Sequence, residues 1–412
     1  HYFSRKQPDL NWENPEIRQE IFDMMRFWFD KGIDGFRMDS ISLIAKDPSF
    51  PLIDSKKYPD IFSFYAKEPR LHLYLHEMNR QVLSKYDCMS VGEGSAVMVD
   101  DVAKFVDPAR EELNMLYHFD AARIRNTTLP DNPESGIDYS LIALKKMFTE
   151  WDKAIDKGWP SIYLGNHDQP RMVSRFGSDK DEFRALSAKM LITFLLTMRG
   201  TPYWFAGDEI GMRNIRFDRI EDYNDIDTIN RYKKAKAEGK DPQAVLDEQK
   251  ETGRDNARTP FQWDRSPEAG FTAGTPWLKV NPDYTWINVA DEEKDPTSIL
   301  NYFKKVVSFR KENPSLIYGS YHLLDAENPQ CYIFLRKTGA DTYLIMLNFS
   351  PKAAISTPGI DMSNAHVLLD NYGDRSHMAP QKDITLRPFE AIVFQLNHPV
   401  YESFIDSLDL LE

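Results

Sequence analysis

Cysteine is scarce in this sequence, because only Cys88 and Cys331 occur among its 412 residues. Two cysteines so far apart in the chain do not form the disulfide framework of a small secreted domain, and low cysteine usage fits a reducing compartment. No signal peptide opens the chain. We therefore expect a cytoplasmic protein without disulfides.

Long apolar runs and an excess of basic residues are also absent. No stretch of about 18 consecutive apolar residues occurs, so we expect no transmembrane helix and no membrane partner. The chain has 51 Lys and Arg against 64 Asp and Glu, which gives a net charge of −13. Nucleic-acid binding needs basic patches, so this charge argues against a nucleic-acid partner.

What remains is the composition of an ordinary globular protein, with 42% hydrophobic and 28% charged residues. A chain of this length can bury a large core and form more than one domain. Aromatic residues make up 13% of the sequence. This richness fits sugar-binding surfaces and a large core equally well, so it does not decide the function.

One stretch, residues 33–40, is a short apolar strand that ends in charge. Its sequence is Ile-Asp-Gly-Phe-Arg-Met-Asp-Ser. Arg37 and Asp39 are two residues apart, so their side chains lie on the same face of a strand. The guanidinium keeps the Asp39 carboxylate ionised at neutral pH, as a nucleophile requires. Taken alone, the pair is explained equally well as a structural ion pair at a strand end.

Two further strand-like runs end in acidic residues. The run 88–93 ends at Glu93, and the run near 160–166 leads to Asp168. Segments with helical periodicity precede the three runs, at residues 15–31, 71–86 and 137–157. Three acids at the carboxyl ends of successive parallel strands would converge on one face of a β/α barrel, where barrel enzymes carry their chemistry.

Five short motifs give these runs a family resemblance. Gly-Phe-Arg-Met-Asp at 35–39, Gly-Glu-Gly at 92–94 and Asn-His-Asp at 166–168 resemble, in this order, three signature regions of the α-amylase superfamily, glycoside hydrolase family 13. Gln-Pro-Asp-Leu-Asn at 7–11 and Arg-Asp-Asn-Ala-Arg-Thr-Pro-Phe-Gln-Trp at 254–263 are similar to segments of its oligo-1,6-glucosidase branch. The resemblance runs from residue 1 to about residue 397.

The resemblance implies an α/β fold, with a (β/α)8 TIM-barrel catalytic domain followed by an all-β sandwich. Only five barrel strands are expected in this chain, near residues 33–39, 88–93, 112–118, 160–166 and 201–206, whereas a closed barrel has eight. In the family the nucleophile follows the fourth strand. We therefore expect the first three βα units to be lacking, and a separate N-terminal segment to be a possible partner that completes the barrel.

Changes in pattern along the chain predict the domain boundaries. Residues 1–314 are expected to form the partial barrel, with a charged excursion at 208–275 that is helical in part at 226–249. A helix at 182–199 is apolar nearly all round and is therefore expected to be buried. Residues 315–397 alternate between strands and turns, as in a β-sandwich. For the tail, 398–412, a short helix and disorder both stay open.

The resemblance assigns catalytic roles to the three acids. Glycoside hydrolysis needs two carboxyl groups that flank the scissile bond. Carried over by motif, Asp39 is the nucleophile and Glu93 the general acid and later the base. Asp168 holds hydroxyls of the reactive sugar. The resemblance implies no cofactor and no metal at the site, and any calcium loop of the family would lie in the lacking N-terminal part.

Three further residues are expected to bind the substrate or to orient these acids. Arg37 orients Asp39, and His167 and Arg258 reach the hydroxyls of the reactive sugar. For His167 the alternative is a structural histidine at a strand end. For Arg258 it is a loop ion pair with an acid such as Asp255.

The predicted function is that of a retaining, exo-acting α-glucosidase on short oligosaccharides. In the resembling branch, Val after the nucleophile accompanies α-1,6 cleavage, and Thr or Ala accompanies α-1,4 cleavage. Ser40 matches neither, so the linkage stays open. The alternatives are a catalytically incomplete or non-catalytic fragment, a trehalose-6-phosphate hydrolase, a dextran glucosidase and a sucrose isomerase, although the Arg/Asp-rich loop of the isomerases is not found.

Overall fold

The computed structural model describes residues 1, 4–54, 56–58, 61–339, 341–360, 362, 364–375 and 382–396. The predicted tail, 398–412, lies outside the described residues. The chain divides into two compact units. The first comprises His1–Ala121 and Met147–Ser161, and the second comprises Ala122–Lys146 and Ile162–Glu412.

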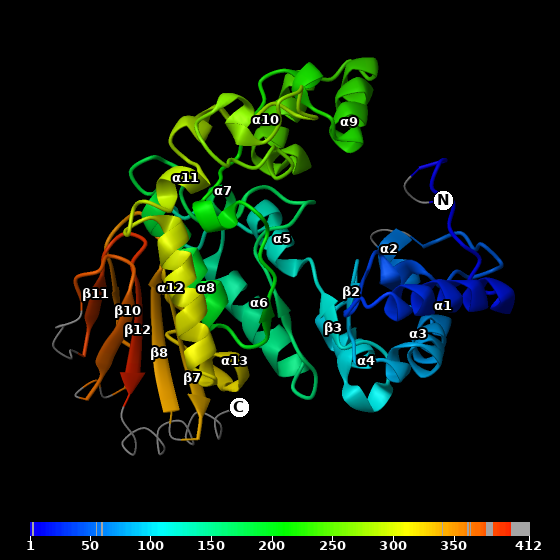
Figure 1. Ribbon diagram of the computed structural model, residues 1–412, viewed down its shortest axis with the longest axis horizontal. Helices are drawn as coiled ribbons and strands as arrows, with labels where there is room; N and C mark the ends of the chain where they lie inside the picture. The colour runs from blue at the N-terminus through cyan, green and yellow to red at the C-terminus, as the bar shows by residue number, and fades with distance from the viewer. Residues whose placement is uncertain are drawn as a thin grey trace. The chain divides into compact units, whose positions relative to one another are not determined.

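A three-stranded parallel sheet forms the centre of the first unit (Figure 1). Its strands, in the order β1-β2-β3, are β1 (Gly35–Met38), β2 (Met89–Glu93) and β3 (Met115–Tyr117). The helices of this unit are α1 (Pro15–Asp30), α2 (Ile61–Tyr65), α3 (Arg70–Gln81) and α4 (Val102–Val106). The predicted strands near 33–39, 88–93 and 112–118 are thus confirmed, each shorter than expected.

Local sequence explains how α1 leads into β1. Asn14 caps the helix, because its side chain accepts a hydrogen bond from the backbone N–H of Glu16 at 2.9 Å. Pro15 occupies the first turn, where its missing N–H costs nothing. At the start of β1, a Cβ on Gly35 would lie only 2.0 Å from the carbonyl oxygen of Met89. Glycine is therefore required for β1 to pair closely with β2.

The second unit contains two short strands and most of the remaining helices. Strand β4 (Ser161–Ile162), which begins in the first unit, pairs with β5 (Thr201–Pro202). The helices wholly inside this unit are α7 (Met172–Phe176), α8 (Arg184–Thr197), α9 (Ile226–Ala237), α10 (Pro242–Thr252), α11 (Val289–Glu292), α12 (Ile299–Glu312) and α13 (Ser315–Tyr318). Helices α5 (Asp120–Thr127) and α6 (Leu141–Ala154) contribute residues to both units.

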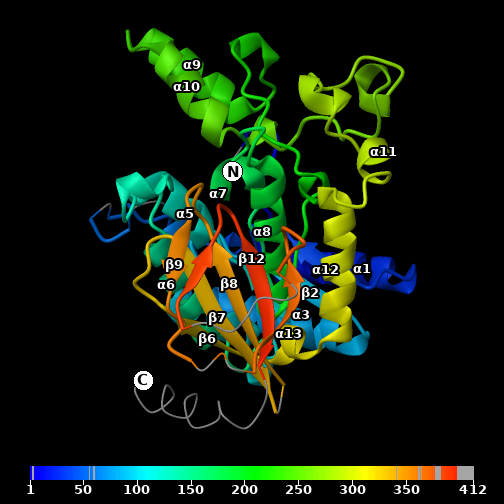
Figure 2. The same cartoon turned by 90° about the vertical axis from the view of Figure 1, so that its left-hand side faces the viewer.

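An antiparallel sheet follows α13, with strands in the order β10-β12-β8-β7-β6 (Figure 2). These strands are β6 (Ser320–Leu324), β7 (Cys331–Thr338), β8 (Asp341–Asn348), β10 (His366–Asp370) and β12 (Ala391–Leu396). A second sheet pairs β9 (Ala354–Ser356) with β11 (Ile384–Leu386). Ile333 and Leu335 face the core that includes Ile384 and Leu386, so the two sheets share one apolar interior.

The other face of the large sheet packs on α8. Phe194 of α8 lies 5.1 Å from Tyr332 and 6.5 Å from Phe334, measured between ring centroids. Helix α12 covers α8 as well (Figure 1). Nearly every residue of α8 is buried, which confirms the expectation for a helix that is apolar on all sides.

Two expectations about composition can be compared with this structure. Cys88 and Cys331 are both free thiols in this structure. Across the described ranges, no helix combines the length and the apolar character that crossing a bilayer requires.

Candidate active site

Three of the predicted site residues meet in the first unit. Arg37 lies on β1, Asp39 follows β1 directly, and Glu93 ends β2, the neighbouring strand. Arg37 forms an ion pair with Asp39 through Nη1, and its Nη2 lies 3.2 Å from Oε2 of Glu93. One guanidinium group therefore bridges two carboxyl groups at the carboxyl ends of neighbouring parallel strands.

Ser40 joins this group through its backbone. It adopts a left-handed conformation, with φ 45° and ψ 33°, where the chain leaves β1. The turn aims its N–H at Glu93, and the N–H donates a hydrogen bond to Oε2 at 2.8 Å. The segment that carries Asp39 is thereby tied to Glu93.

The two carboxyl groups lie in different environments. The Asp39 side chain is 76% exposed, whereas that of Glu93 is 8% exposed. Burial raises the pKa of Glu93, and the neighbouring Asp39 raises it further, although the Ser40 N–H and the Arg37 guanidinium act in the opposite direction. A carboxyl group that favours its proton thus lies beside one that is bound to a cation and open to solvent.

The second unit contains another group of predicted residues, centred on Asp168. Its Oδ1 accepts hydrogen bonds from Arg258 Nη2 at 2.7 Å and from Arg254 Nη1 at 3.3 Å. His167 Nε2 lies 3.3 Å from its Oδ2, and the Asp168 N–H donates to Asn166 Oδ1 at 2.8 Å. Two cations and a histidine therefore surround this carboxylate, which lies in the loop after β4.

Asp225 belongs to the same group, although the sequence did not indicate it. It caps the N-terminus of α9 by accepting a hydrogen bond from the Thr228 N–H at 3.0 Å. Its Oδ1 lies 2.7 Å from Arg254 Nη2 and 3.8 Å from Arg258 Nη1. Burial alone would raise the pKa of Asp225, but the bonds from Thr228 and the two cations outweigh burial and lower it.

These contacts decide which acids face Arg258. The side chain of Asp255 accepts the backbone N–H groups of Asn224 and Asp225, at 2.6 and 2.8 Å. It therefore shapes the loop that presents Asp225, while Arg258 pairs with Asp168 and Asp225. Arg254, which the sequence placed only inside a branch motif, makes the same two contacts as Arg258.

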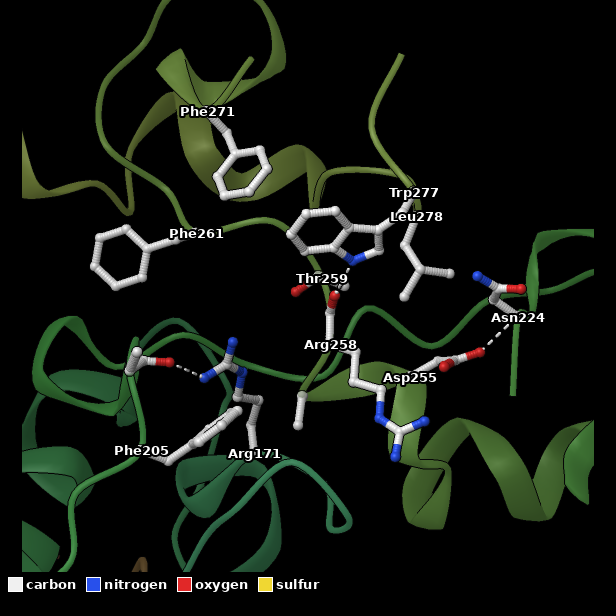
Figure 3. A pocket seen from close by; sticks show the side chains of 12 residues that line it. Arg171, Phe205, Asn224, Asp255, Arg258, Thr259, Phe261, Phe271, Trp277 and Leu278 are labelled. Carbon is white, nitrogen blue, oxygen red and sulfur yellow. Dashed lines mark hydrogen bonds between the residues drawn. The ribbon is translucent and has the colours of Figure 1, made fainter. Parts of the chain in front are cut away.

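An aromatic cavity of about 470 Å³ adjoins Arg258 in the second unit (Figure 3). Its lining includes the aromatic residues Phe205, Phe261, Phe271 and Trp277. The Trp277 indole N–H donates a hydrogen bond to the Arg258 carbonyl oxygen at 2.8 Å, and its ring lies edge to face with Phe271 at 5.0 Å. These contacts fix the indole, and the residue is still 61% exposed.

Polar groups with unused hydrogen-bonding capacity also line this cavity. Thr259 Oγ1 and Arg171 Nε are buried, and neither makes a hydrogen bond within the described part of the chain. Arg171 is held by the Ala206 carbonyl oxygen at 2.7 Å and lies over the ring of Phe205 (Figure 3). Aromatic faces combined with a few polar groups suit a ligand such as a sugar, which has both apolar and hydroxyl-bearing faces.

No cluster of three or more His, Cys, Asp or Glu side chains that could hold a metal ion occurs among the residues that the structure describes.

Comparisons with known proteins agree with these features. The family description "Alpha amylase, catalytic domain" matches residues 1–319. The chain is 47% identical to an oligo-1,6-glucosidase of Parageobacillus thermoglucosidasius, over 97% of this chain and 72% of that protein. It is 38% identical to a trehalose-6-phosphate hydrolase of Bacillus subtilis, over 97% and 71%. A crystal structure of an isomaltulose synthase from Protaminobacter rubrum is similar, with a TM-score of 0.90 and 37% identity over 97% and 71% of the two chains.

Fold and side chains together define a β/α-barrel enzyme, with a catalytic domain followed by a β-sandwich, as the sequence predicted. The chain belongs to the α-amylase family, and it is a glycoside hydrolase. The resemblance that the five motifs suggested is thereby confirmed.

Proposed function

We propose that this enzyme is a retaining, exo-acting α-glucosidase that hydrolyses terminal α-1,6 or α-1,4 glucosidic bonds of short oligosaccharides. The contrast between Glu93 and Asp39 is the observation that carries the proposal. A buried carboxyl group with a raised pKa suits a proton donor, and an exposed carboxylate bound to Arg37 suits a nucleophile.

The reaction needs two steps and no cofactor. Glu93 donates its proton to the glycosidic oxygen, the bond to the leaving sugar breaks, and Asp39 forms a covalent bond to the anomeric carbon. Glu93, now a carboxylate, then takes a proton from water as the water oxygen attacks the same carbon. The bond to Asp39 breaks, and glucose leaves with its original anomeric configuration.

The group around Asp168 would hold the terminal sugar. Asp168 offers carboxylate oxygens to sugar hydroxyls, while Arg254 and Arg258 supply donors beside it. His167 is exposed and lies at the same carboxylate, which suits a hydrogen bond to a hydroxyl. Selection of a terminal sugar by this crowded, charged group would account for exo action.

The names of the relatives support this choice of substrates. The oligo-1,6-glucosidase is more similar in sequence than the trehalose-6-phosphate hydrolase and the isomaltulose synthase. These two names define the competing activities, namely hydrolysis of trehalose 6-phosphate and isomerisation of sucrose.

The test is product analysis on isomaltose, maltose, sucrose and trehalose 6-phosphate, with the anomer first released identified by NMR. We expect glucose from isomaltose or maltose, first as the α-anomer, and no glucose from the Asp39→Asn variant. Asp100→Asn, which removes an exposed carboxylate elsewhere in the first unit, is the matched control and should stay active. Release of β-glucose, internal cleavage of long chains, or inactivity of the native chain would contradict the proposal.

A further inference from the structure

Helix α3 carries two histidines that the proposed reaction does not use. His72 and His76 are four positions apart, so their side chains lie next to each other on one face of the helix. Both are partly exposed, and the His72 side chain is 20% exposed. Two imidazole rings at this spacing on a helix can bind one metal ion together.

The segment between α4 and β3 fixes the ring of each histidine. Nδ1 of His72 lies 2.8 Å from Oε2 of Glu112, and Nδ1 of His76 lies 3.2 Å from the carbonyl oxygen of Arg110. The His72 ring also packs edge to face on the buried Phe105, with centroids 4.8 Å apart. Both rings are therefore held through the same nitrogen by groups outside the helix.

These partners determine which nitrogen of each ring carries the proton. A carbonyl oxygen only accepts hydrogen bonds, and the Glu112 carboxylate, whose Oε1 lies 2.9 Å from Arg110 Nη2, accepts as well. Nδ1 is therefore the donor in both rings, and in the neutral ring the lone pair is on Nε2. Across the described ranges, neither Nε2 makes a hydrogen bond.

The two contacts match the surroundings of histidines that bind metals. Such a histidine usually donates its second ring nitrogen to a carboxylate or to a backbone carbonyl group, which fixes the tautomer and the ring orientation. His72 has the first kind of partner, and His76 has the second. A structural ion pair explains His72 alone, but it does not explain a second histidine, one helical turn further on, with the same tautomer.

Space for the rest of a coordination shell exists beside His76. A cavity of about 550 Å³ has His76, Asn79 and Glu111 in its lining. Glu77 lines it as well, but its carboxylate is paired with Arg18 at 2.7 Å. Because no cluster of three possible ligands occurs in the described part of the chain, water would occupy the other positions around an ion.

We propose that His72 and His76 form a binding site for one divalent transition-metal ion, with Nε2 of each ring as a ligand. Imidazole nitrogen suits zinc, nickel and copper ions, whereas magnesium and calcium prefer oxygen ligands. The ion would join two successive turns of α3. Because it binds the folded chain, it would also stabilise the first unit.

The experiment titrates zinc chloride, and separately magnesium chloride, into the native chain and its variants by calorimetry. We expect the native chain to bind one more equivalent of Zn²⁺ than His76→Ala does. Loss of one of two linked ligands should weaken this site about 100-fold. His76→Ala is the decisive variant because it loses only a bond to a backbone carbonyl group, and magnesium should give no such difference. His366→Ala removes an exposed histidine of β10 and is the matched control, which should bind like the native chain.

Two further readouts separate a built site from adventitious binding. Glu112→Gln leaves both ligands in place but removes the carboxylate that orients His72, so its affinity for Zn²⁺ should fall about 10- to 100-fold. Zn²⁺ should raise the melting temperature of the native chain and of His366→Ala, but not that of His76→Ala.

Equal zinc binding by the native chain and His76→Ala would overturn the proposal, and so would an equal loss in His366→Ala. Because every readout is metal binding or melting, the result does not depend on the proposed α-glucosidase activity.

Discussion

The two units hold their carboxyl groups in different surroundings. In the first unit, Arg37 contacts both Asp39 and Glu93. In the second unit, Arg254 and Arg258 together serve Asp168 and Asp225.

This difference has opposite consequences for protonation. Burial is the largest cause that raises the pKa of Glu93. The pKa of Asp225 is lowered despite burial, by the hydrogen bonds from Thr228 and then by the charges of Arg254 and Arg258. These surroundings thus separate a group suited to proton transfer from a group suited to holding a substrate.

The largest expected effect comes from removing the exposed carboxylate of the first unit. Asp39→Asn keeps the shape but cannot form the glycosyl ester, so kcat should fall about 10⁴-fold or more. Steady-state glucose release measures the loss, with Asp100→Asn as the control. A loss below about tenfold would show that Asp39 is not the nucleophile.

The second effect concerns the proton on Glu93. Glu93→Gln should lower kcat by about 10²- to 10⁴-fold on isomaltose or maltose, and by less on an aryl glucoside whose leaving group needs no proton. The native enzyme needs Glu93 protonated, so its activity should be present below the raised pKa and fall as the pH rises through it.

The variant should lack this fall at alkaline pH, and azide should restore turnover by replacing water as the nucleophile in the second step. Equal losses on both substrates, with the alkaline fall retained, would assign the proton to another group.

The third prediction removes one of the two arginines that contact Asp168 and Asp225. Arg258→Met leaves Arg254 alone with Asp168 and Asp225, so the pKa of Asp225 should rise. We expect kcat/KM to fall about 10- to 100-fold, the usual effect of losing a charge-assisted hydrogen bond. A new ionisation should appear in the acid part of its pH profile. Arg258→Lys keeps the charge, so its kcat/KM should lie between those of the native enzyme and Arg258→Met. An unchanged pH profile in Arg258→Met would show that Arg258 does not lower the pKa of Asp225.

A smaller effect is expected in the aromatic cavity, where stacking on a ring takes the place of charged contacts. Trp277→Ala should raise KM about fivefold with little change in kcat, since stacking on an aromatic face contributes about 1 kcal/mol. Trp277→Phe keeps a ring but loses the hydrogen bond to the Arg258 carbonyl, so it should retain most of the affinity. Equal KM values in all three proteins would exclude the cavity from substrate binding.

A separate effect is expected on stability rather than on activity, at a buried carboxyl group that lies near Arg171. Asp208 is buried with its Oδ1 3.7 Å from Arg171 Nη1, and burial raises its pKa to about 7. The folded state therefore holds this proton more tightly, and stability should fall as the pH rises from about 4 to about 7.

Asp208→Asn removes this dependence. The free energy of unfolding of the variant minus that of the native chain should therefore be about 2 kcal/mol larger at pH 8 than at pH 5. Urea unfolding at the two pH values measures the difference, and parallel curves would contradict it.

Sequence reasoning found the parts of the site that local geometry determines. Arg37 and Asp39 share a face because they are two positions apart on a strand, and Glu93 ends the neighbouring strand. Asn166–Asp168 follows a strand as predicted, but β4 has only two residues, because the chain leaves the sheet early to form this loop. The catalytic and binding roles of these residues stay predictions.

Contacts between distant segments were not predictable in the same way. Asp225 carries the signal of a helix cap, and only folding brings it to Arg254 and Arg258. Likewise, Arg336 is fully buried, and its guanidinium donates to the carbonyl oxygens of Leu316 and Gly319, among others. A sequence shows that an arginine is present but not which carbonyl groups will surround it.

Within the excursion at 208–275, local sequence explains a helix boundary that was not predicted. The helical stretch expected at 226–249 is two helices, α9 and α10. Gly239, with φ 69°, ends the first, and Asp241 caps the second, where Pro242 begins it.

Trapping the covalent intermediate tests the central claim most directly. The enzyme is incubated with 5-fluoro-α-D-glucosyl fluoride, digested, and analysed by mass spectrometry. The account predicts one fluoroglucosyl group on the peptide that spans residues 33–40, attached to Asp39 and absent from Asp39→Asn. A label on Glu93 or Asp168, or turnover of the reagent without any labelled peptide, would contradict it.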